Sequence, residues 1–216
     1  MIKAVIFDLD GTLLNTIEDL ANACNYALKQ SDFPTHEVDK YKTFVGDGRY
    51  KLIERIVPAE SKNDETISKV LELFDEYYEA HMIDMTKPYE GIIELLDKLN
   101  YSGLKLAVVS NKPHEFTVEV VKKFFGDNLH ITFGHRENTP TKPNPYSVLE
   151  AMELFNIAKD ECVYVGDSNV DIETARNAGV KSVGVAWGFR GTGELQEAGA
   201  DYIVNTTAEL KKLIIQ

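Results

Sequence analysis

Cysteine is scarce in this chain of 216 residues, which contains only Cys24 and Cys162. The two lie far apart in apolar patterns, so we expect two buried free thiols rather than a disulfide, as in a reducing compartment. None of the five histidines has the spacing of a zinc site. The sequence therefore argues against a disulfide scaffold and against a structural zinc module.

Long apolar runs and an excess of basic charge are also missing. No stretch approaches the roughly 18 apolar residues of a membrane span, and the N-terminus lacks the features of a signal peptide. Because 35 acidic residues outnumber 23 basic ones, the formal net charge is −12. Such a surface repels phosphate backbones and anionic lipid. We therefore expect a cytoplasmic protein that binds neither nucleic acid nor membranes; the sequence does not determine its oligomeric state.

Apolar, β-branched segments predict a series of buried strands. They lie at residues 2–8, 104–110, 129–133, 162–166, 181–186 and 201–204. Helical patterns separate the later segments, at about residues 90–100, 113–124, 145–156, 169–178 and 206–213. Strands that alternate with helices of this length indicate an α/β fold, namely a doubly wound, Rossmann-like parallel sheet with helices on both faces.

The stretch after the first strand has a different pattern. Apolar residues repeat at helical spacing from Ile17 onwards and again from Ile67 to Met82, with shorter helices expected at 36–43 and 48–57. We therefore predict that residues 15–84 form an all-helical insert, or cap, and that residues 1–14 and 85–216 form the α/β core.

Acidic residues follow two of the predicted strands. Asp8 and Asp10 end the first strand and precede Gly11, while Asp167 follows strand 162–166. In a doubly wound sheet these two strands lie side by side, and ligands bind beyond their carboxyl ends. Clustered carboxylates suit a hard cation, so we expect Mg²⁺ at this edge. The alternative interpretation of Asp167 is a helix N-cap.

Two further polar groups stand at strand ends. Ser110 and Asn111 close strand 104–110, where a hydroxyl and backbone N–H groups can hold a phosphate oxygen. Lys142 lies in a loop that three prolines stiffen, so it could neutralise phosphate charge from a fixed position. Considered without other motifs, Ser110 and Asn111 are most simply a helix cap, and Lys142 is most simply a solvated lysine.

Four motifs together resemble those of the haloacid dehalogenase superfamily. They are FDLDGTLLNT, VVSNK, TKPNP and VGDSNVD, in this order and along essentially the whole chain. A helical insert after the first motif is similar to the C1-type cap of the phosphoglycolate phosphatase and β-phosphoglucomutase branches. The glycine-bearing segment from Thr43 to Arg49 favours the phosphoglycolate phosphatase-like branch.

The resemblance implies a role for each motif residue. Asp8 would be the nucleophile that forms an aspartyl-phosphate, and Asp10 the general acid and then the general base. Mg²⁺ would be held by the Asp8 carboxylate, the Asp10 backbone carbonyl and Asp167. The remaining implied residues are phosphate-binding Ser110 and Lys142, the nearby backbone of Gly11 and Asn111, and Asp171, which would orient Lys142 or support the metal.

The function implied is a Mg²⁺-dependent phosphatase for a small phosphorylated metabolite, with phosphoglycolate as the example. A phosphomutase of the β-phosphoglucomutase type and a pyrophosphatase are alternatives, and a non-catalytic binding protein is disfavoured because every catalytic position is filled. In the cap, Arg49 offers a two-pronged donor for a carboxylate of the substrate. The alternative interpretation is that Arg49 is a surface residue that pairs with Asp47 or contacts solvent.

Overall fold

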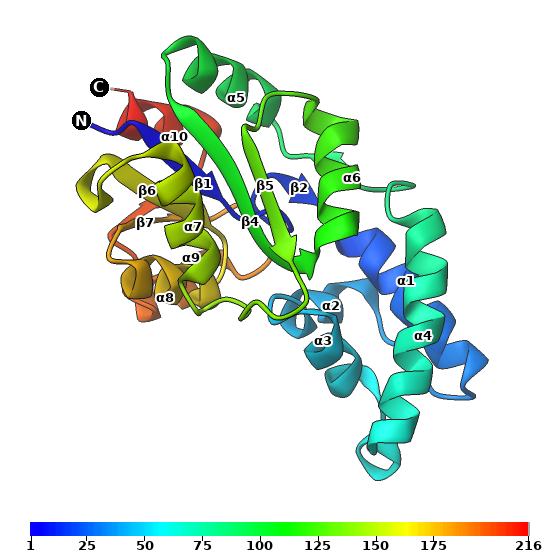
Figure 1. The fold of residues 1–216 in the computed structure, drawn as a ribbon. Helices are drawn as coiled ribbons and strands as arrows, with labels where there is room; N and C mark the ends of the chain where they lie inside the picture. The colour runs from blue at the N-terminus through cyan, green and yellow to red at the C-terminus, as the bar shows by residue number, and fades with distance from the viewer. Residues whose placement is uncertain (216) are drawn as a thin grey trace.

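Six parallel strands form the core of the computed structural model, which describes residues 1–215 (Figure 1). The strand order is β5-β4-β1-β6-β7-β8, with every neighbouring pair parallel. Their bounds are β1 Ala4–Phe7, β4 Lys105–Pro113, β5 Ile131–His135, β6 Cys162–Gly166, β7 Lys181–Val185 and β8 Tyr202–Val204. The prediction of a doubly wound parallel sheet is confirmed, and β1 is central, between β4 and β6.

Helices cover both faces of this sheet because its strands are apolar on both sides. In β1, Val5 and Phe7 belong to one buried cluster with α5, α6 and α10, while Ala4 and Ile6 belong to a second with α7 and α8. The helices of the core are α5 Ile92–Tyr101, α6 His114–Phe125, α7 Tyr146–Phe155, α8 Asn169–Ala178, α9 Gly191–Glu197 and α10 Thr207–Ile214, with a 3₁₀ turn, η2, at Lys159–Glu161.

A group of helices lies at one end of the molecule, beyond the carboxyl ends of the strands (Figure 1). They are α1 Ile17–Gln30, α2 Val38–Phe44, α3 Arg49–Ile56, η1 Ala59–Ser61 and α4 Asp64–His81. The long helices α1 and α4 pack together, and Tyr26 stacks on Tyr77 with ring centroids 4.5 Å apart. We call these helices and their connecting loops the cap. The division at residues 15–84 remains a prediction.

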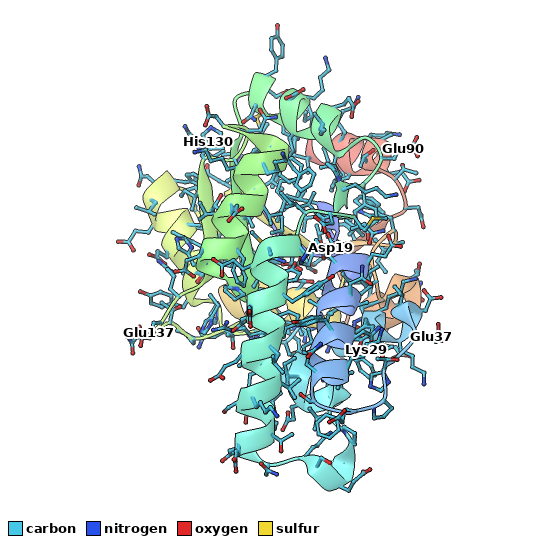
Figure 2. All side chains as sticks on the ribbon, turned by 90° about the vertical axis from the view of Figure 1, so that its right-hand side faces the viewer. Asp19, Lys29, Glu37, Glu90, His130 and Glu137 are labelled. Carbon is cyan, nitrogen blue, oxygen red and sulfur yellow. The ribbon has the colours of Figure 1, made fainter. Side chains whose placement is uncertain are left out.

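Two chain crossings join the cap to the core, and they lie side by side. The short strand β2, Leu14–Asn15, pairs with β3, Lys87–Pro88, in an antiparallel arrangement. The buried Asp19 carboxylate accepts hydrogen bonds from the backbone N–H groups of Met85, at 3.0 Å, and Thr86, at 2.8 Å. Asp19 lies at the core end of α1 (Figure 2). This carboxylate therefore fastens the returning chain to the first cap helix.

The structure differs from the sequence prediction in a few elements. Strand β4 continues through Lys112 to Pro113, and β5 starts at Ile131 instead of residue 129. Helix α9 was not predicted because its first turn, Gly191-Thr192-Gly193, has little helix propensity. Both cysteines are free and buried, as expected. Among residues 1–215, no helix combines the length and apolar character that a membrane crossing requires.

Candidate active site

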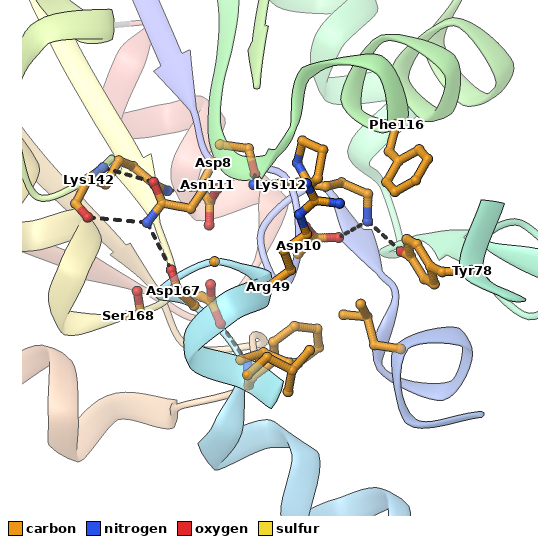
Figure 3. Close-up of a pocket in the computed structure, with 18 of the residues that line it drawn as sticks. Asp8, Asp10, Arg49, Tyr78, Asn111, Lys112, Phe116, Lys142, Asp167 and Ser168 are labelled. Carbon is orange, nitrogen blue, oxygen red and sulfur yellow. Dashed lines mark hydrogen bonds and ion pairs between the residues drawn. The ribbon is translucent and has the colours of Figure 1, made fainter. Parts of the chain in front are cut away.

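A small cavity lies between the carboxyl ends of the central strands and the cap (Figure 3). Its volume is about 70 Å³. The core side carries the polar groups Asp8, Asp10, Ser110, Lys112, Lys142 and Asp167. The cap side contributes Val45, Gly46, Arg49, Leu52, Phe74 and Tyr78. The sheet thus brings together motif residues that are up to 159 positions apart, counted from Asp8 to Asp167.

Three buried carboxylates form a cluster, and two of them, Asp8 and Asp167, line this cavity. Asp8, Asp167 and Asp171 each place an oxygen within 4.8 Å of the other two. Burial, followed by the charge of Asp171, raises the pKa of Asp8 to about 7 against the opposing charge of Lys142. Burial and the charges of Asp171 and Asp8 also raise the pKa of Asp167 well above its ordinary value. The cluster therefore stores unfavourable electrostatic energy when it is ionised.

This stored energy has a consequence for stability. The folded-state pKa of Asp8, about 7, exceeds the 3.8 of an exposed aspartate. Without a metal, the folded chain therefore binds more protons than the unfolded chain between these two pH values. The contribution of Asp8 to the free energy of unfolding falls as pH rises through this window.

Lys142 is the buried cation of the cluster. Its Nζ lies 2.8 Å from Asp8 Oδ1, 2.7 Å from Asp171 Oδ1 and 3.1 Å from the hydroxyl of Tyr164. Burial by itself would lower the pKa of Lys142, but the charges of Asp171 and Asp8 outweigh it and raise this pKa. The ammonium is therefore charged and held directly beside Asp8.

Asp171 is fully occupied by protein donors. Besides contacting Lys142, it accepts hydrogen bonds from the backbone N–H of Ser168 at 3.0 Å and from its hydroxyl at 2.7 Å. Of the two roles predicted for Asp171, orienting Lys142 therefore agrees better with its contacts than supporting a metal.

Asp167 has a different environment. It does not cap α8, because Ser168 occupies the N-cap position, so the N-cap interpretation of Asp167 is wrong. Its Oδ2 accepts a hydrogen bond of 2.7 Å from the backbone N–H of Phe189. Gly11 adopts φ +88°, and a Cβ there would lie 2.4 Å from Asp167 Oδ2. Glycine is thus required where the loop after β1 crosses this carboxylate.

The donor set suits a hard divalent cation. All the candidate ligands are oxygens, as Mg²⁺ prefers. The carboxylates of Asp8, Asp10 and Asp171 form direct ion pairs with two buried ammoniums, those of Lys112 and Lys142. Together with Asp167, this group of six side chains carries two formal negative charges in excess. A divalent ion would neutralise them and relieve the repulsion between Asp8 and Asp167.

Ser110 and Asn111 both line the cavity, and Asn111 contacts Lys142. The Ser110 hydroxyl accepts a hydrogen bond of 3.2 Å from the backbone N–H of Lys112. The Asn111 side chain accepts from the Lys142 N–H at 2.8 Å and donates to the Lys142 carbonyl at 3.2 Å. It also donates to the carbonyl of Gly46 in the cap, at 3.1 Å. Asn111 therefore fixes the Lys142 loop and contacts the cap, a side-chain role that the sequence did not indicate.

Sequence reasoning assigned no role to Lys112 or Tyr78. The Lys112 Nζ, with a side chain only 4% exposed, lies 3.2 Å from Asp10 Oδ1 and also donates to the Tyr78 hydroxyl (Figure 3). Helical spacing places Tyr78 among the apolar positions of the helix predicted from Ile67 to Met82 and gives it no further role. The sequence feature that could have identified Lys112 as a site residue is its position directly after Ser110 and Asn111 at the end of a strand.

Arg49 is the first residue of α3 and lines the cavity. It forms an ion pair with Asp75 of α4, and its side chain is 43% exposed. The alternative that Arg49 pairs with Asp47 is wrong, because Asp47 pairs with Arg55. Arg49 is thus placed at the mouth of the cavity by a partner on a neighbouring helix.

Comparison with known proteins agrees with this arrangement. A family model described as haloacid dehalogenase-like hydrolase matches residues 5–185. The phosphoglycolate phosphatase of Vibrio parahaemolyticus is 31% identical over 223 residues, which cover 99% of this chain and 96% of that protein.

Solved structures show the same relationship. A structure from Lactobacillus delbrueckii subsp. bulgaricus has a TM-score of 0.94 at 35% identity, with 98% of both chains covered. A predicted phosphoglycolate phosphatase from Haemophilus somnus has a TM-score of 0.91 at 29% identity, covering 98% of this chain and 97% of that one. Since the family model and these relatives span most of its length, the chain belongs to the haloacid dehalogenase-like hydrolases and is a phosphatase that resembles the phosphoglycolate phosphatases.

Proposed function

We propose that this protein is a Mg²⁺-dependent phosphatase that hydrolyses a small phosphomonoester through an aspartyl-phosphate on Asp8. The observation that carries the proposal is the buried group of Asp8, Lys142 and Asp167 at the carboxyl ends of β1 and β6, with Asp10 beside it. Phosphate-monoester hydrolysis has one of the highest uncatalysed barriers, and covalent catalysis divides it into two easier displacements.

In the first step, an oxygen of the Asp8 carboxylate attacks phosphorus and forms an acyl-phosphate bond. The ester P–O bond breaks, and Asp10 donates its proton to the departing oxygen. Lys142 is held within 2.8 Å of Asp8 and would offset charge on the phosphoryl oxygens, together with the Ser110 hydroxyl. The backbone of Gly11 and Asn111 would complete the phosphate contacts.

In the second step, water attacks the phosphorus of the aspartyl-phosphate while Asp10 accepts a proton from it. The bond between Asp8 and phosphorus breaks, which releases inorganic phosphate and restores both aspartates. Bound Mg²⁺ would offset the negative charge shared by phosphate and carboxylates. Its ligands would be the Asp8 and Asp167 carboxylates and the Asp10 backbone carbonyl, while Asp171 keeps Lys142 in place.

For the substrate, we propose a compound of the size of phosphoglycolate. Its support is the small cavity, the presence of Arg49 at its mouth and the names of the relatives. A phosphomutase would instead depend on a bisphosphate activator, and a pyrophosphatase would prefer pyrophosphate. A panel of small phosphate esters and pyrophosphate, assayed with Mg²⁺, tests the proposal. We expect the highest kcat/KM for a short carboxylate-bearing ester; failure to hydrolyse any monoester would refute it.

Metal binding is expected to change stability as well as activity. In excess chelator, Asp167→Asn should raise Tm by about 2–4 °C, the shift that about 1 kcal/mol produces at this chain length. The reason is that the variant removes one of the clustered negative charges and keeps an acceptor for Phe189. Mg²⁺ should raise the Tm of the wild type and of an exposed control, Asp127→Asn, but not that of Asp167→Asn. Equal Mg²⁺ shifts in all three, read by calorimetry, would place the ion elsewhere.

Arg49 is expected to contribute to substrate choice. Arg49→Ala should lower kcat/KM for phosphoglycolate by about 10–100-fold, because a charge-assisted contact to the carboxylate is worth about 1.5–3 kcal/mol. Hydrolysis of 4-nitrophenyl phosphate, which lacks a second anion, should hardly change. Lys51→Ala is the control, since it removes a cation exposed on the same helix. Equal losses on both substrates would show that Arg49 serves cap structure instead.

A further inference from the structure

Among residues 1–215, three hydrogen bonds join the cap to the core around the cavity. The carbonyl of Gly46 accepts from Asn111, and the carbonyl of Val45 accepts from Arg190 at 2.7 Å. The third contact joins the Tyr78 hydroxyl of α4 to Lys112 of β4. The third contact continues through Lys112 to Asp10, the proposed acid and base (Figure 3).

Lys112 is well fixed between its two partners. Its ammonium lies 4.6 Å from the centre of the Tyr78 ring, and Phe116 meets that ring edge-on with centroids 5.7 Å apart. Tyr78 itself is almost fully buried and stacks on Phe74 with centroids 5.2 Å apart. A buried ammonium needs partners for its charge, and it finds them in one carboxylate of the core and one hydroxyl of the cap.

This arrangement makes the position of Lys112 depend on the cap. The Lys112 side chain has several rotatable bonds, and two named groups restrain its head. If α4 moved away with the cap, Lys112 would lose the Tyr78 hydroxyl and the ring, and its hold on Asp10 would loosen. A carboxylate that transfers protons must be held close to its target geometry.

We propose that Tyr78 and Lys112 form a positioning link through which cap closure orients the Asp10 carboxylate for proton transfer. Neither residue transfers the proton itself. The link would make acid and base catalysis efficient only when the cavity is closed. The inference rests on the proposed function, because it takes Asp10 as the acid and base.

The test compares Tyr78→Phe, Lys112→Met, Lys112→Gln and Asp10→Asn in full-length protein with Mg²⁺. Each variant is assayed on 4-nitrophenyl phosphate, whose leaving group needs little protonation, and on phenyl phosphate, whose leaving group needs more. Tyr77→Phe is the matched control. Like Tyr78→Phe, this variant removes a phenolic hydroxyl from α4, but at the neighbouring position. There Tyr77 stacks on Tyr26 and His81 within the cap.

We expect Tyr78→Phe to lower kcat/KM for phenyl phosphate by about 10-fold and for 4-nitrophenyl phosphate by less than about 2-fold. Lys112→Met should show the same selectivity with a loss of about 100-fold. Lys112→Gln should recover part of that loss, because its amide can still donate to Asp10. Tyr77→Phe should match the wild type. General structural damage would lower kcat/KM for both substrates to the same extent, and Lys112→Gln would then be no more active than Lys112→Met.

The outcomes separate the inference from the function on which it rests. If Asp10→Asn shows the leaving-group selectivity and the Lys112 and Tyr78 variants do not, the positioning link is wrong and the proposed function stands. If Asp10→Asn also lacks it, Asp10 is not the acid and base, and the inference falls together with that part of the proposed mechanism, whereas the aspartyl-phosphate on Asp8 is tested separately by Asp8→Asn. Phosphoglycolate is assayed as a third substrate: if Lys112→Met loses activity on it and on neither aryl ester, Lys112 binds substrate and the inference is overturned.

Discussion

Asp8→Asn is expected to lower phosphatase activity by more than about 10⁴-fold, the scale of loss when a covalent nucleophile is removed. The amide keeps the size of the side chain and cannot form the acyl-phosphate. The fold should survive, because Lys142 keeps Asp171 as a partner at 2.7 Å and a buried charge is removed. The measurement is initial-rate hydrolysis of 4-nitrophenyl phosphate with saturating Mg²⁺.

Asp127→Asn provides the control for this experiment, since it makes the same chemical change at an exposed position. Circular dichroism and thermal melting should show that the wild type, Asp8→Asn and Asp127→Asn are all folded. Retention of more than about a tenth of wild-type activity by Asp8→Asn would contradict the covalent scheme, because a spectator carboxylate is dispensable and a nucleophile is not.

Asp10→Asn is expected to separate the two chemical steps. With 4-nitrophenyl phosphate, the first step needs little acid assistance, so Asp8 should still become phosphorylated. The second step needs a base for water, and its loss should slow breakdown of the aspartyl-phosphate by about 10²–10⁴-fold. Rapid quenching with labelled substrate should therefore trap a phosphorylated enzyme.

The contrast with Asp8→Asn makes this result specific, because that variant should trap no label at all. Phenyl phosphate serves as the second substrate, and its phosphorylation of Asp10→Asn should be slow because the leaving oxygen lacks an acid. Equal losses on both esters, with no trapped intermediate, would remove Asp10 from the acid and base role.

The core of this protein could be predicted from local patterns. Apolar β-branched segments and the helices between them fix a parallel sheet because buried strands and amphipathic helices have different periods. A sheet of this kind has one edge where the central strands end. Asp8 and Asp167 were therefore expected to meet, although they are far apart in the chain. Here β1 does pair with β6, and the two carboxylates lie within 4.8 Å.

Several site residues were predicted from the family motifs rather than from local apolar patterns. Lys142, Ser110 and Gly11 were assigned by resemblance to a family, and each lies at the cavity or against a carboxylate that lines it. Their places are determined by strand ends and tight loops, which vary little once the sheet is formed. Asp171 was assigned with two alternative roles, and its bonds to Ser168 and Lys142 favour one of them.

Contacts between the cap and the core depended on the tertiary structure. Lys112 meets Tyr78 across 34 residues and Asp10 across 102 residues. Arg49 meets Asp75 rather than the nearer Asp47, because α3 packs against α4. Helical periodicity shows that Tyr78 faces inwards, but not which group it meets. That depends on how the cap helices sit against the strand ends, and no local sequence pattern encodes this arrangement.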